Sequence, residues 1–591
     1  MYDKSPYVRV SDNAADCALG WQEIGAAIRE RRDGPNATVC FECYPGTLVA
    51  DLAQSLSEEL APDCVLRADS CYWPEEAIEA KFQEFLTDDP VFGRMNSATI
   101  EDFLDPSRVA EAQAEPEPAQ SGLKLVIGTG ATLIAKEWDL LIYADLARWE
   151  IQQRYRRGEI ANLGMNNRRE KASLKYKRGF FLDWRAADRL KTKLLPDVDF
   201  LLDCNDRNAP KMISGAELHK GLEAAVRRPF RVVPFFDPGP WGGHWMEAVC
   251  DLPRDKPNHA WCFDCVPEEN SLLLGFGSRR VEIPALDLVL MQPRRLLGEA
   301  VEQAFGAEFP IRFDFLDTMG GGNLSLQVHP RAKYIREHFG MAYTQDESYY
   351  LLDAAEDGCV YLGLRDATDP DEMMREIAEA ATAAEPAFNA EEFVNKFPAR
   401  KHDHFLIPAG TVHCSGRNSM VLEISATPYI FTFKLWDWAR MDLEGNPRPL
   451  HVEHGAANIC WERRTEWVRD QLINRIEVIA TGPHWREERT GLHSLEFIET
   501  RRHWFTGPVE HDTQGNLNVL NLVQGDRAVV ESPTQEFAPF EVHYAETFLV
   551  PAAVGRYTIR PAEGTNHEEL ATIKAFVRPE AIKRSHRQSK G

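Results

Sequence analysis

The sequence predicts an α/β domain with a mostly parallel sheet, followed by an all-β region built from antiparallel strands. In the first 225 residues, short apolar runs alternate with amphipathic helical stretches. Beyond that point, short alternating strands follow one another with Gly and Pro between them. A chain of 591 residues is too long for a single hydrophobic core. We therefore expect three domains, over residues 1–225, 226–460 and 461–591.

The first domain is expected to alternate strands with helices. Residues 36–60 indicate a strand, a Pro-Gly turn and an amphipathic helix. The other apolar runs typical of strands are 64–69, 123–130, 138–145 and 197–204. Between them, "EEAIEAKFQEFL" and "LARWEIQQRYRRG" predict helices, and the Ala-, Glu-, Pro- and Gln-rich residues 105–122 predict a mobile loop.

The all-β region is expected to contain one helical insertion at about 370–400. Apolar residues recur at helical intervals in "DEMMREIAEAATAAEP", and Pro386 is expected to end this helix. Asn389 is a candidate cap for the helix that follows, with Glu392 three residues later. After about residue 460, a second set of alternating strands predicts a smaller second barrel.

Composition favours a cytoplasmic protein that does not bind nucleic acid or membranes. No run of eighteen apolar residues is present, and charges interrupt the first residues where a signal peptide would need its apolar stretch. The twelve cysteines are scattered apart from Cys40/Cys43 and Cys262/Cys265. A four-thiolate zinc site is possible, but packed free thiols are the preferred interpretation because the pairs are far apart in sequence. The net charge of −25 argues against general nucleic-acid binding.

One segment has the opposite charge. Between Arg148 and Lys193, fourteen Lys or Arg stand against five Asp or Glu, a local charge of +9 that leaves −34 for the rest. Such a segment either faces an anionic ligand or forms a solvated helix face. A nucleotide or other phosphorylated ligand is therefore a possible partner of the first domain.

The stretch "NLSLQVHP", residues 323–330, alternates as a strand does and so places Ser325, Gln327 and His329 on one face. Glu347 follows in "TQDESYYLL", and His413 follows in "IPAGTVHC", where Pro408 and Gly410 predict a tight turn. In a small antiparallel barrel, inward-facing residues of several strands can meet. Two imidazoles, a carboxylate and an amide oxygen suit zinc or a similar divalent metal.

These motifs resemble, in order and spacing, class I mannose-6-phosphate isomerase, a zinc-dependent cupin enzyme. The matching stretches are "PWGGHW", "LSLQVHP", the Glu of "DESYYLL", "IPAGTVH", "VLEIS" and "LWDWARMDLEGNPRPLHVE". The resemblance covers roughly residues 226–591. It implies a double cupin (jelly-roll) module, and an enzyme of carbohydrate metabolism that interconverts mannose 6-phosphate and fructose 6-phosphate through a cis-enediol.

Carried over residue by residue, the resemblance implies one zinc ion per chain, held by Gln327, His329, Glu347 and His413. It also implies substrate-binding roles for Ser325, near the phosphate, and for Arg440, and a place for Glu423 in the sugar pocket. The zinc would hold substrate oxygens and stabilise developing negative charge. The base that transfers the proton is not identified.

One catalytic position departs from the family pattern. Lys434 in "YIFTFKLWDW" stands where the family has an arginine. Lysine keeps the positive charge but loses the planar, paired hydrogen bonds of the guanidinium. Two alternatives to the isomerase therefore stay open: a sugar-phosphate or nucleotide sensor without turnover, and a bifunctional sugar kinase and isomerase.

The first domain loosely resembles a P-loop kinase of the uridine kinase type, in its strand–turn–helix at 38–55, in Asp69 and in its late basic helix. In place of the phosphate-binding loop stands "ECYPGTLVAD", which lacks the lysine and the metal-binding hydroxyl in register. We expect a degenerate kinase-like domain with a regulatory or scaffolding role. A working phosphotransferase is the alternative.

Overall fold

The computed structural model describes residues 1–32, 36–114, 122–382, 387–428, 430–443, 445, 448–491, 493–565 and 569–578. It divides into two compact units. The α/β unit comprises Tyr7–Ala225 and Glu268–Gln292, and the β unit comprises Met1–Pro6, Val226–Pro267 and Pro293–Gly591. The first segment of the α/β unit ends at Ala225, and residues 268–292 return to this unit. The domain boundaries expected at residues 225 and 460 stay predictions.

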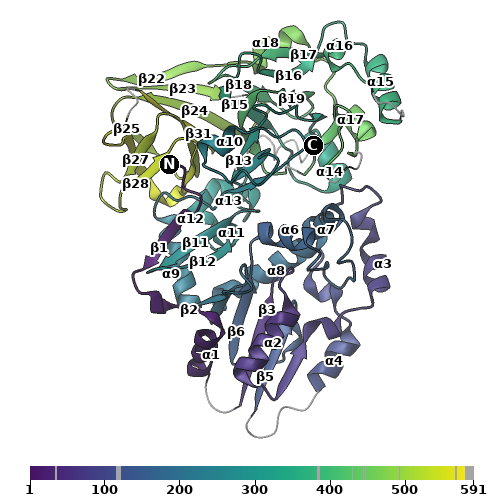
Figure 1. The fold of residues 1–591 in the computed structure, drawn as a ribbon, viewed down its shortest axis with the longest axis vertical. Coiled ribbons are helices and arrows are strands. Elements are labelled where there is room, and N and C mark those ends of the chain that lie inside the picture. Colours follow the sequence, from purple (N-terminus) through teal and green to yellow (C-terminus); the bar gives the residue numbers. More distant parts are fainter. Residues whose placement is uncertain are drawn as a thin grey trace. The chain divides into compact units, whose positions relative to one another are not determined.

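The α/β unit contains a seven-stranded sheet (Figure 1). In spatial order its strands are β2 (Cys17–Leu19), β8 (Lys211–Ser214), β7 (Phe200–Asp203), β6 (Leu140–Asp145), β3 (Ala37–Cys43), β5 (Leu123–Gly128) and β4 (Cys64–Arg67). The neighbours from β7 to β4 pair in parallel, whereas β8 and β2 are antiparallel. The mostly parallel sheet expected from the alternating pattern is therefore present. The kinase-like identity of this unit stays a prediction.

The α/β unit contains ten α-helices within the described residues. They are α1 (Gly20–Arg31), α2 (Val49–Leu60), α3 (Glu75–Leu86), α4 (Pro106–Ala114), α5 (Ala131–Ile134), α6 (Arg148–Arg156), α7 (Ala172–Arg178), α8 (Trp184–Leu194), α9 (Gly215–Val226) and α11 (Ala285–Met291), with a π-helical turn at Gly179–Asp183. The apolar stripes of α1 and α2 pack on one face of the sheet, where Ile28 and Leu56 join Phe41 in the core. On the other face, Lys191 of α8 contacts the ring of Tyr143.

The mobile loop expected at 105–122 is partly wrong, because Pro106–Ala114 form α4. Proline at the first helical position and an Ala-rich continuation both favour a helix, and these signals outweigh the compositional bias. Residues 115–121 lie outside the described residues.

A small separate sheet completes the α/β unit. It consists of β1 (Tyr7–Ser11), β11 (Ser271–Phe276) and β12 (Arg279–Pro284). β1 pairs in parallel with β11, so residues more than 260 positions apart in the chain are joined.

The first part of the β unit consists of two antiparallel sheets. The larger one contains β18 (His404–Ile407), β15 (Glu347–Ala354), β20 (Ser419–Ala426), β13 (Ile311–Asp317), β10 (Trp261–Cys265) and β9 (Phe235–Asp237). The smaller contains β17 (Val394–Pro398), β16 (Cys359–Leu364), β19 (His413–Ser415), β14 (Leu326–Val328) and β21 (Phe433–Trp436).

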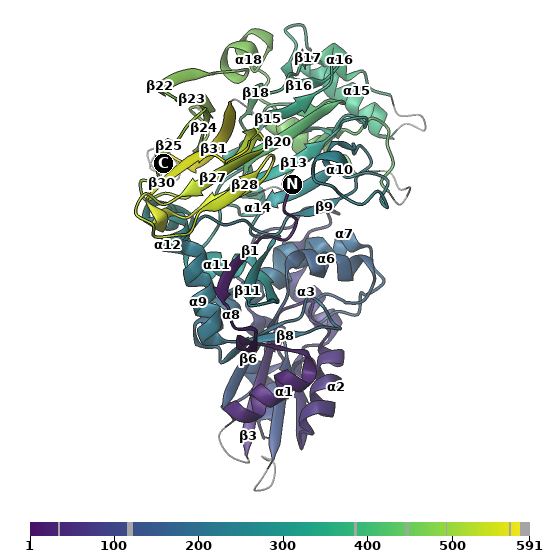
Figure 2. The same ribbon diagram turned by 60° about the vertical axis from the view of Figure 1, so that its left-hand side comes forward.

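The second part of the β unit also has two antiparallel sheets (Figure 2). Leu520, Val530 and Tyr557 belong to the apolar core between them. One contains β22 (Glu477–Gly482), β23 (Trp485–Gly491), β24 (Ile498–Phe505), β31 (Leu570–Val577), β26 (Asn518–Gln524) and β29 (Thr547–Val550). The other contains β25 (Val509–Asp512), β30 (Arg556–Pro561), β27 (Arg527–Glu531) and β28 (Phe540–His543). The chain as a whole is a mixed α/β fold, and its assignment as a double cupin stays a prediction.

The helices of the β unit are short. They are α10 (Trp245–Val249), α12 (Pro293–Leu297), α13 (Glu299–Phe305), α14 (Ala332–Phe339), α15 (Pro370–Thr382), α16 (Ala390–Phe393), α17 (Val452–Asn458) and α18 (Thr465–Leu472). α15 and α16 form the expected insertion, although the position of Pro386 lies outside the described residues. The side chain of Asn389 makes no capping hydrogen bond, and its amide donates instead to Glu392 (2.7 Å).

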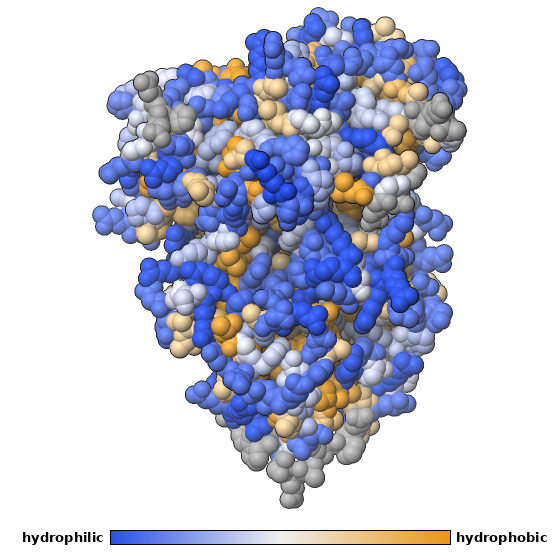
Figure 3. Space-filling view, in the orientation of Figure 1, coloured by the Kyte–Doolittle hydropathy of each residue, from blue (hydrophilic) through white to orange (hydrophobic). Residues whose placement is uncertain are grey.

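All twelve cysteines are free thiols. The two Cys-x-x-Cys pairs lie buried in β3 and β10, where their thiols pack within the strands. Within the described ranges, no helix has the length and apolar character needed to cross a membrane. The face in Figure 3 is mainly hydrophilic, with hydrophobic residues in small separate groups.

Candidate metal centre

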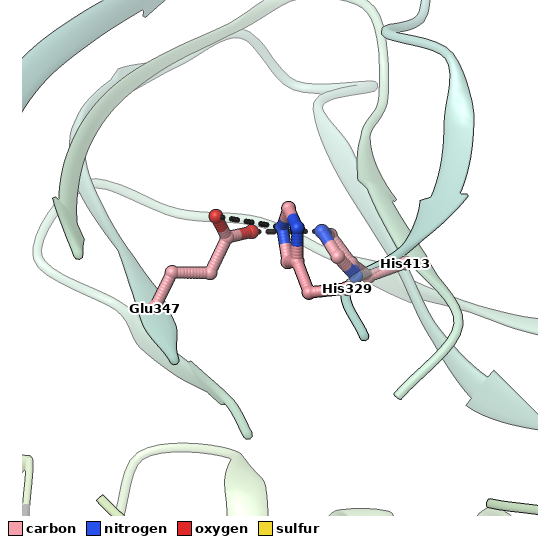
Figure 4. A group of neighbouring side chains, drawn as sticks. All are labelled: His329, Glu347 and His413. Carbon is pink, nitrogen blue, oxygen red and sulfur yellow. Dashed lines mark ion pairs between the residues drawn. The ribbon is translucent and has the colours of Figure 1, made fainter. Parts of the chain in front are cut away.

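Three side chains from the two sheets of the first β part converge on one point (Figure 4). His329 directly follows β14, His413 begins β19, and Glu347 begins β15 of the facing sheet. The carboxylate oxygens of Glu347 lie 3.1 Å from Nε2 of His329 and 2.7 Å from Nε2 of His413. All three residues are at most 2 % exposed. The group expected from "LSLQVHP", "DESYYLL" and "IPAGTVH" is therefore brought together.

Each imidazole is oriented by a backbone carbonyl. Nδ1 of His413 lies 2.8 Å from the carbonyl oxygen of Thr411, and Nδ1 of His329 lies 3.2 Å from that of Phe431. Protons on Nδ1 would leave both Nε2 atoms as acceptors that point toward Glu347. A histidine that binds a metal through one ring nitrogen commonly donates the other to such a carbonyl.

The electrostatics of the three residues fit a divalent cation. Burial acts to raise the pKa of Glu347. When His329 and His413 are protonated at Nε2, their charge and hydrogen bonds outweigh burial and hold this pKa well below its ordinary value. Oε1 of Glu347 and Nε2 of His329 are buried without a hydrogen bond that satisfies them. An ionised carboxylate and two imidazole nitrogens, whose donor atoms lie within 4.8 Å of one another, match the ligand chemistry of zinc.

Gln327 supplies a possible fourth ligand. It pairs directly with His413 between β14 and β19, and its Nε2 lies 3.2 Å from Nε2 of His413. Rotating the amide by 180° would place the oxygen at this position, and the two orientations differ only in the hydrogen bonds that they make. The expected strand at 323–330 is shorter than predicted, because β14 covers only Leu326–Val328. Ser325, buried, directly precedes it.

The turn that carries His413 is held by Arg463, which the sequence motifs did not indicate. Its buried guanidinium donates to the carbonyls of Pro408 (2.6 Å) and Ala409 (2.9 Å) and to Oγ1 of Thr411 (2.5 Å). Gly410 has a φ of +89°, and a Cβ atom there would lie 2.6 Å from Sγ of Cys460. The expected Pro-Ala-Gly-Thr turn is thus present and is fixed by residues some fifty positions later.

Lys434 lies on the other side of Gln327. It pairs with Gln327 between β21 and β14, so both side chains leave the same face of the sheet. Burial, followed by the cations Arg448 and Arg440, lowers the pKa of Lys434 to about 8, although Asp437 opposes this. The residue that departs from the family pattern therefore lies beside the candidate ligands.

Asp437 organises the positive charge near Lys434. Its carboxylate lies 2.5 Å from the guanidinium of Arg440 and 2.9 Å from that of Arg448. Arg440 also donates to the carbonyl of Asn323, 2.5 Å away, just before β14. Arg440 is thus partly engaged in holding the strand, and its substrate-binding role stays a prediction.

Glu423 lies in a buried network next to Glu347. Gln345 donates to Glu347 (3.0 Å) and to Glu423 (3.2 Å), and Arg312 forms an ion pair with Glu423. Burial, followed by the negative charges of Asp314 and Glu347, raises the pKa of Glu423 well above its ordinary value. Gln345 stands two residues before Glu347 in the sequence. This polar residue beside a candidate ligand is the only feature of the sequence that could have indicated the network.

Comparisons with known proteins find sequence similarity to one group of enzymes. A probable mannose-6-phosphate isomerase, GmuF, of Bacillus subtilis is 27 % identical over 342 residues, which cover 58 % of this chain and 98 % of that protein. A mannose-6-phosphate isomerase of Streptococcus mutans is 28 % identical over 215 residues, or 36 % of this chain. In sequence, this chain is similar to mannose-6-phosphate isomerases. It spans 62 % of the Streptococcus mutans protein and 66 % of the isomerase ManA of Bacillus subtilis.

Two further comparisons complete the description. The crystal structure of a Bacillus subtilis mannose 6-phosphate isomerase covers 59 % of this chain and 99 % of its own, with 17 % identity and a TM-score of 0.47. Residues 20–227 match a family model described as a domain of unknown function (DUF8485). This match covers most of the α/β unit.

Proposed function

We propose that this chain is a cytoplasmic, zinc-dependent aldose–ketose isomerase that converts mannose 6-phosphate to fructose 6-phosphate and back. The observation that carries the proposal is the buried convergence of His329, Glu347 and His413. The names of the sequence relatives support the reaction and the substrate. One zinc ion per chain would be held by these residues and Gln327.

The residues around the metal ligands have separate roles in this proposal. Bound zinc would act as a Lewis acid toward the substrate oxygens. Lys434 provides a positive charge on the face that carries Gln327, where negative charge builds up when the proton beside the carbonyl is removed. Ser325 and Arg440 would bind the substrate, and Glu423 would line its pocket. The proton leaves one carbon and returns to its neighbour, so the reaction needs no redox partner.

The test is proton exchange in deuterated water. The pure, zinc-loaded protein is incubated with mannose 6-phosphate, glucose 6-phosphate and ribose 5-phosphate, and each sugar is analysed by NMR. The proposal is supported if mannose 6-phosphate gives fructose 6-phosphate that carries deuterium at the carbon beside its carbonyl. Binding of mannose 6-phosphate without deuterium exchange or product would contradict turnover and favour a sensor.

A further inference from the structure

A cavity of about 450 Å³ lies at the carboxyl edge of the parallel sheet of the α/β unit. Tyr44, Arg67 and Gly128 line it where β3, β4 and β5 end, and the start of α2 and residues 159–165 complete much of its wall. At this edge the chain changes sides, since β4 and β5 lie on one side of β3 and β6 and β7 on the other. Open α/β sheets bind ligands at such a point, and this volume is typical of small-molecule sites.

A buried arginine fixes one wall of the cavity. Arg154, only 2 % exposed, donates to the carbonyl of Gly46 (2.9 Å) in the loop after β3 and to that of Cys204 (2.6 Å) after β7. Gly46 has a φ of +109°, and a Cβ atom there would lie 2.8 Å from the side chain of Ile151. These contacts hold the loop after β3 in one conformation.

A buried lysine fixes another part of the cavity wall. Nζ of Lys175, a residue that is 0 % exposed, donates to the carbonyls of Tyr155 (2.8 Å) and Arg168 (2.9 Å) and approaches that of Ile160 (3.5 Å). Burial lowers the pKa of Lys175. Burying the cation of Lys175 costs folding stability. Its presence behind the cavity wall is consistent with a cavity whose shape is formed before a ligand binds. Several cations of the basic segment thus hold the protein's own backbone rather than face solvent or a ligand.

The groups left free in the cavity are cationic and aromatic. Within the described residues, the exposed side chain of Arg168 has no hydrogen bond or ion pair, and the half-buried indole of Trp73 has no ring or hydrogen-bond partner. The carboxylates of the lining are already paired: Asp69 with Arg67, Glu159 with Arg157, and Asp51 with Arg207. The first turn of α2, without a side-chain cap, adds partial positive charge.

We propose that this cavity is a binding site for a nucleoside monophosphate, with the base on Trp73 and the phosphate at Arg168 and the start of α2. An indole face suits base stacking, and an unpaired guanidinium suits a phosphate. The loop after β3 lacks a lysine for a triphosphate, so binding does not require magnesium and transfers no phosphoryl group. The proposal is independent of the isomerase reaction.

The test uses calorimetry on the full-length protein with AMP, with and without EDTA. We expect saturable binding that EDTA leaves unchanged and that a His413→Ala variant retains. Arg168→Ala should weaken AMP binding by at least about tenfold, whereas Arg169→Ala, which removes an exposed neighbouring arginine, should not. Trp73→Leu should weaken AMP binding and leave the weaker binding of ribose 5-phosphate unchanged.

Three results would overturn the proposal. They are the absence of saturable binding of AMP at millimolar concentration, equal losses in Arg168→Ala and Arg169→Ala, and loss of AMP binding in His413→Ala, which would place the nucleotide in the β unit. If ribose 5-phosphate bound as tightly as AMP, the base would not contribute to binding, which would contradict stacking on Trp73. Circular dichroism of each variant checks that the fold is intact.

Discussion

Lys434 lies directly opposite Gln327 in the pairing of β21 with β14, on the face of the sheet that carries the candidate metal ligands. The pairing register, rather than sequence distance, brings together two residues that are more than a hundred positions apart. If Lys434 contributes its charge to the reaction, its replacement should affect turnover more than folding.

The first prediction therefore concerns the charge of Lys434. Lys434→Met keeps the apolar stem and removes the ammonium, so turnover should fall by about 30- to 1000-fold, equivalent to roughly 2–4 kcal/mol of transition-state stabilisation. Lys434→Arg should shift preference toward mannose 6-phosphate more than it raises overall activity. Turnover is measured on several sugar phosphates, with zinc content determined in each variant. Unchanged turnover in a fully zinc-loaded Met variant would place Lys434 outside the chemistry.

The second prediction is the pH dependence that follows from the lowered pKa of Lys434. With a pKa of about 8, Lys434 is protonated below pH 8 and loses its charge above it. Activity should therefore fall as pH rises through about 8. In Lys434→Arg this alkaline fall should disappear, because arginine stays protonated throughout this range. Profiles of kcat/KM between pH 6 and pH 10 compare the two proteins, and identical alkaline falls would contradict the assignment.

The third prediction concerns metal content. His413→Ala removes one imidazole nitrogen from a buried cluster and leaves Glu347 with only His329, so the purified protein should lose its zinc. His404→Leu is the matched control, because it removes another buried histidine outside the cluster. Elemental analysis should give about one zinc per chain in wild type and control. Full occupancy in His413→Ala would refute the ligand assignment.

The fourth prediction tests Arg463 as a positioning residue. Arg463→Met removes three hydrogen bonds to the turn that carries His413, and zinc affinity should fall by about 10- to 100-fold. Arg464→Met is the control, since Arg464 instead holds the carbonyls of Asp366 and Thr368. Competition with a chelator measures the zinc Kd. Equal affinities in the two variants would show that the turn keeps its shape without Arg463.

The fifth prediction concerns acid stability. Burial, followed by the charge of Arg502, lowers the pKa of His404 in the folded protein to about 3, against about 6.5 in an unfolded chain. The neutral ring is therefore favoured by folding. Its stabilising contribution is fully present above pH 6.5 and is lost as pH falls toward 3, at up to about 1.4 kcal/mol per pH unit.

His404→Leu should consequently lose less stability on acidification than the wild type does. Thermal midpoints are measured from pH 7.5 to pH 5 in the presence of EDTA, so that metal loss does not contribute. The midpoint difference between variant and wild type should change in favour of the variant as the pH falls. A constant difference would show that His404 does not titrate differently in the two states.

Local patterns predicted much of the fold and the core of the site. The alternation around Gln327 and the turn around Gly410 indicated where the ligands lie, because period and turn chemistry are local properties of the chain. The sequence did not predict the helix at Pro106–Ala114, because the prediction gave more weight to the Ala-, Glu-, Pro- and Gln-rich composition than to the proline that begins the helix. Arg463 and Arg312 could not be predicted, because each acts through tertiary contacts to residues distant in the chain.

The basic segment shows a further limit of sequence reasoning. Its charge suggested either an anionic ligand or a solvated surface, yet Arg154 and Lys175 are buried and hold backbone carbonyls. Net charge counts residues but does not show which side chains are desolvated. This distinction depends on the fold.

The return of residues 268–292 to the α/β unit bears on how the protein is made. β1 has its parallel partner in β11, and the buried ammonium of Lys191 lies 2.7 Å from the carboxylate of Asp287 as well as from that of Asp145. When only the first 225 residues have been synthesised, the α/β unit still lacks residues 268–292, which contain β11 and Asp287. The α/β unit is complete only after residues 268–292, which lie in sequence between two segments of the β unit, have been synthesised. Cutting the gene at residue 225 would separate β1 and Lys191 from these partners, so neither half would carry a complete unit.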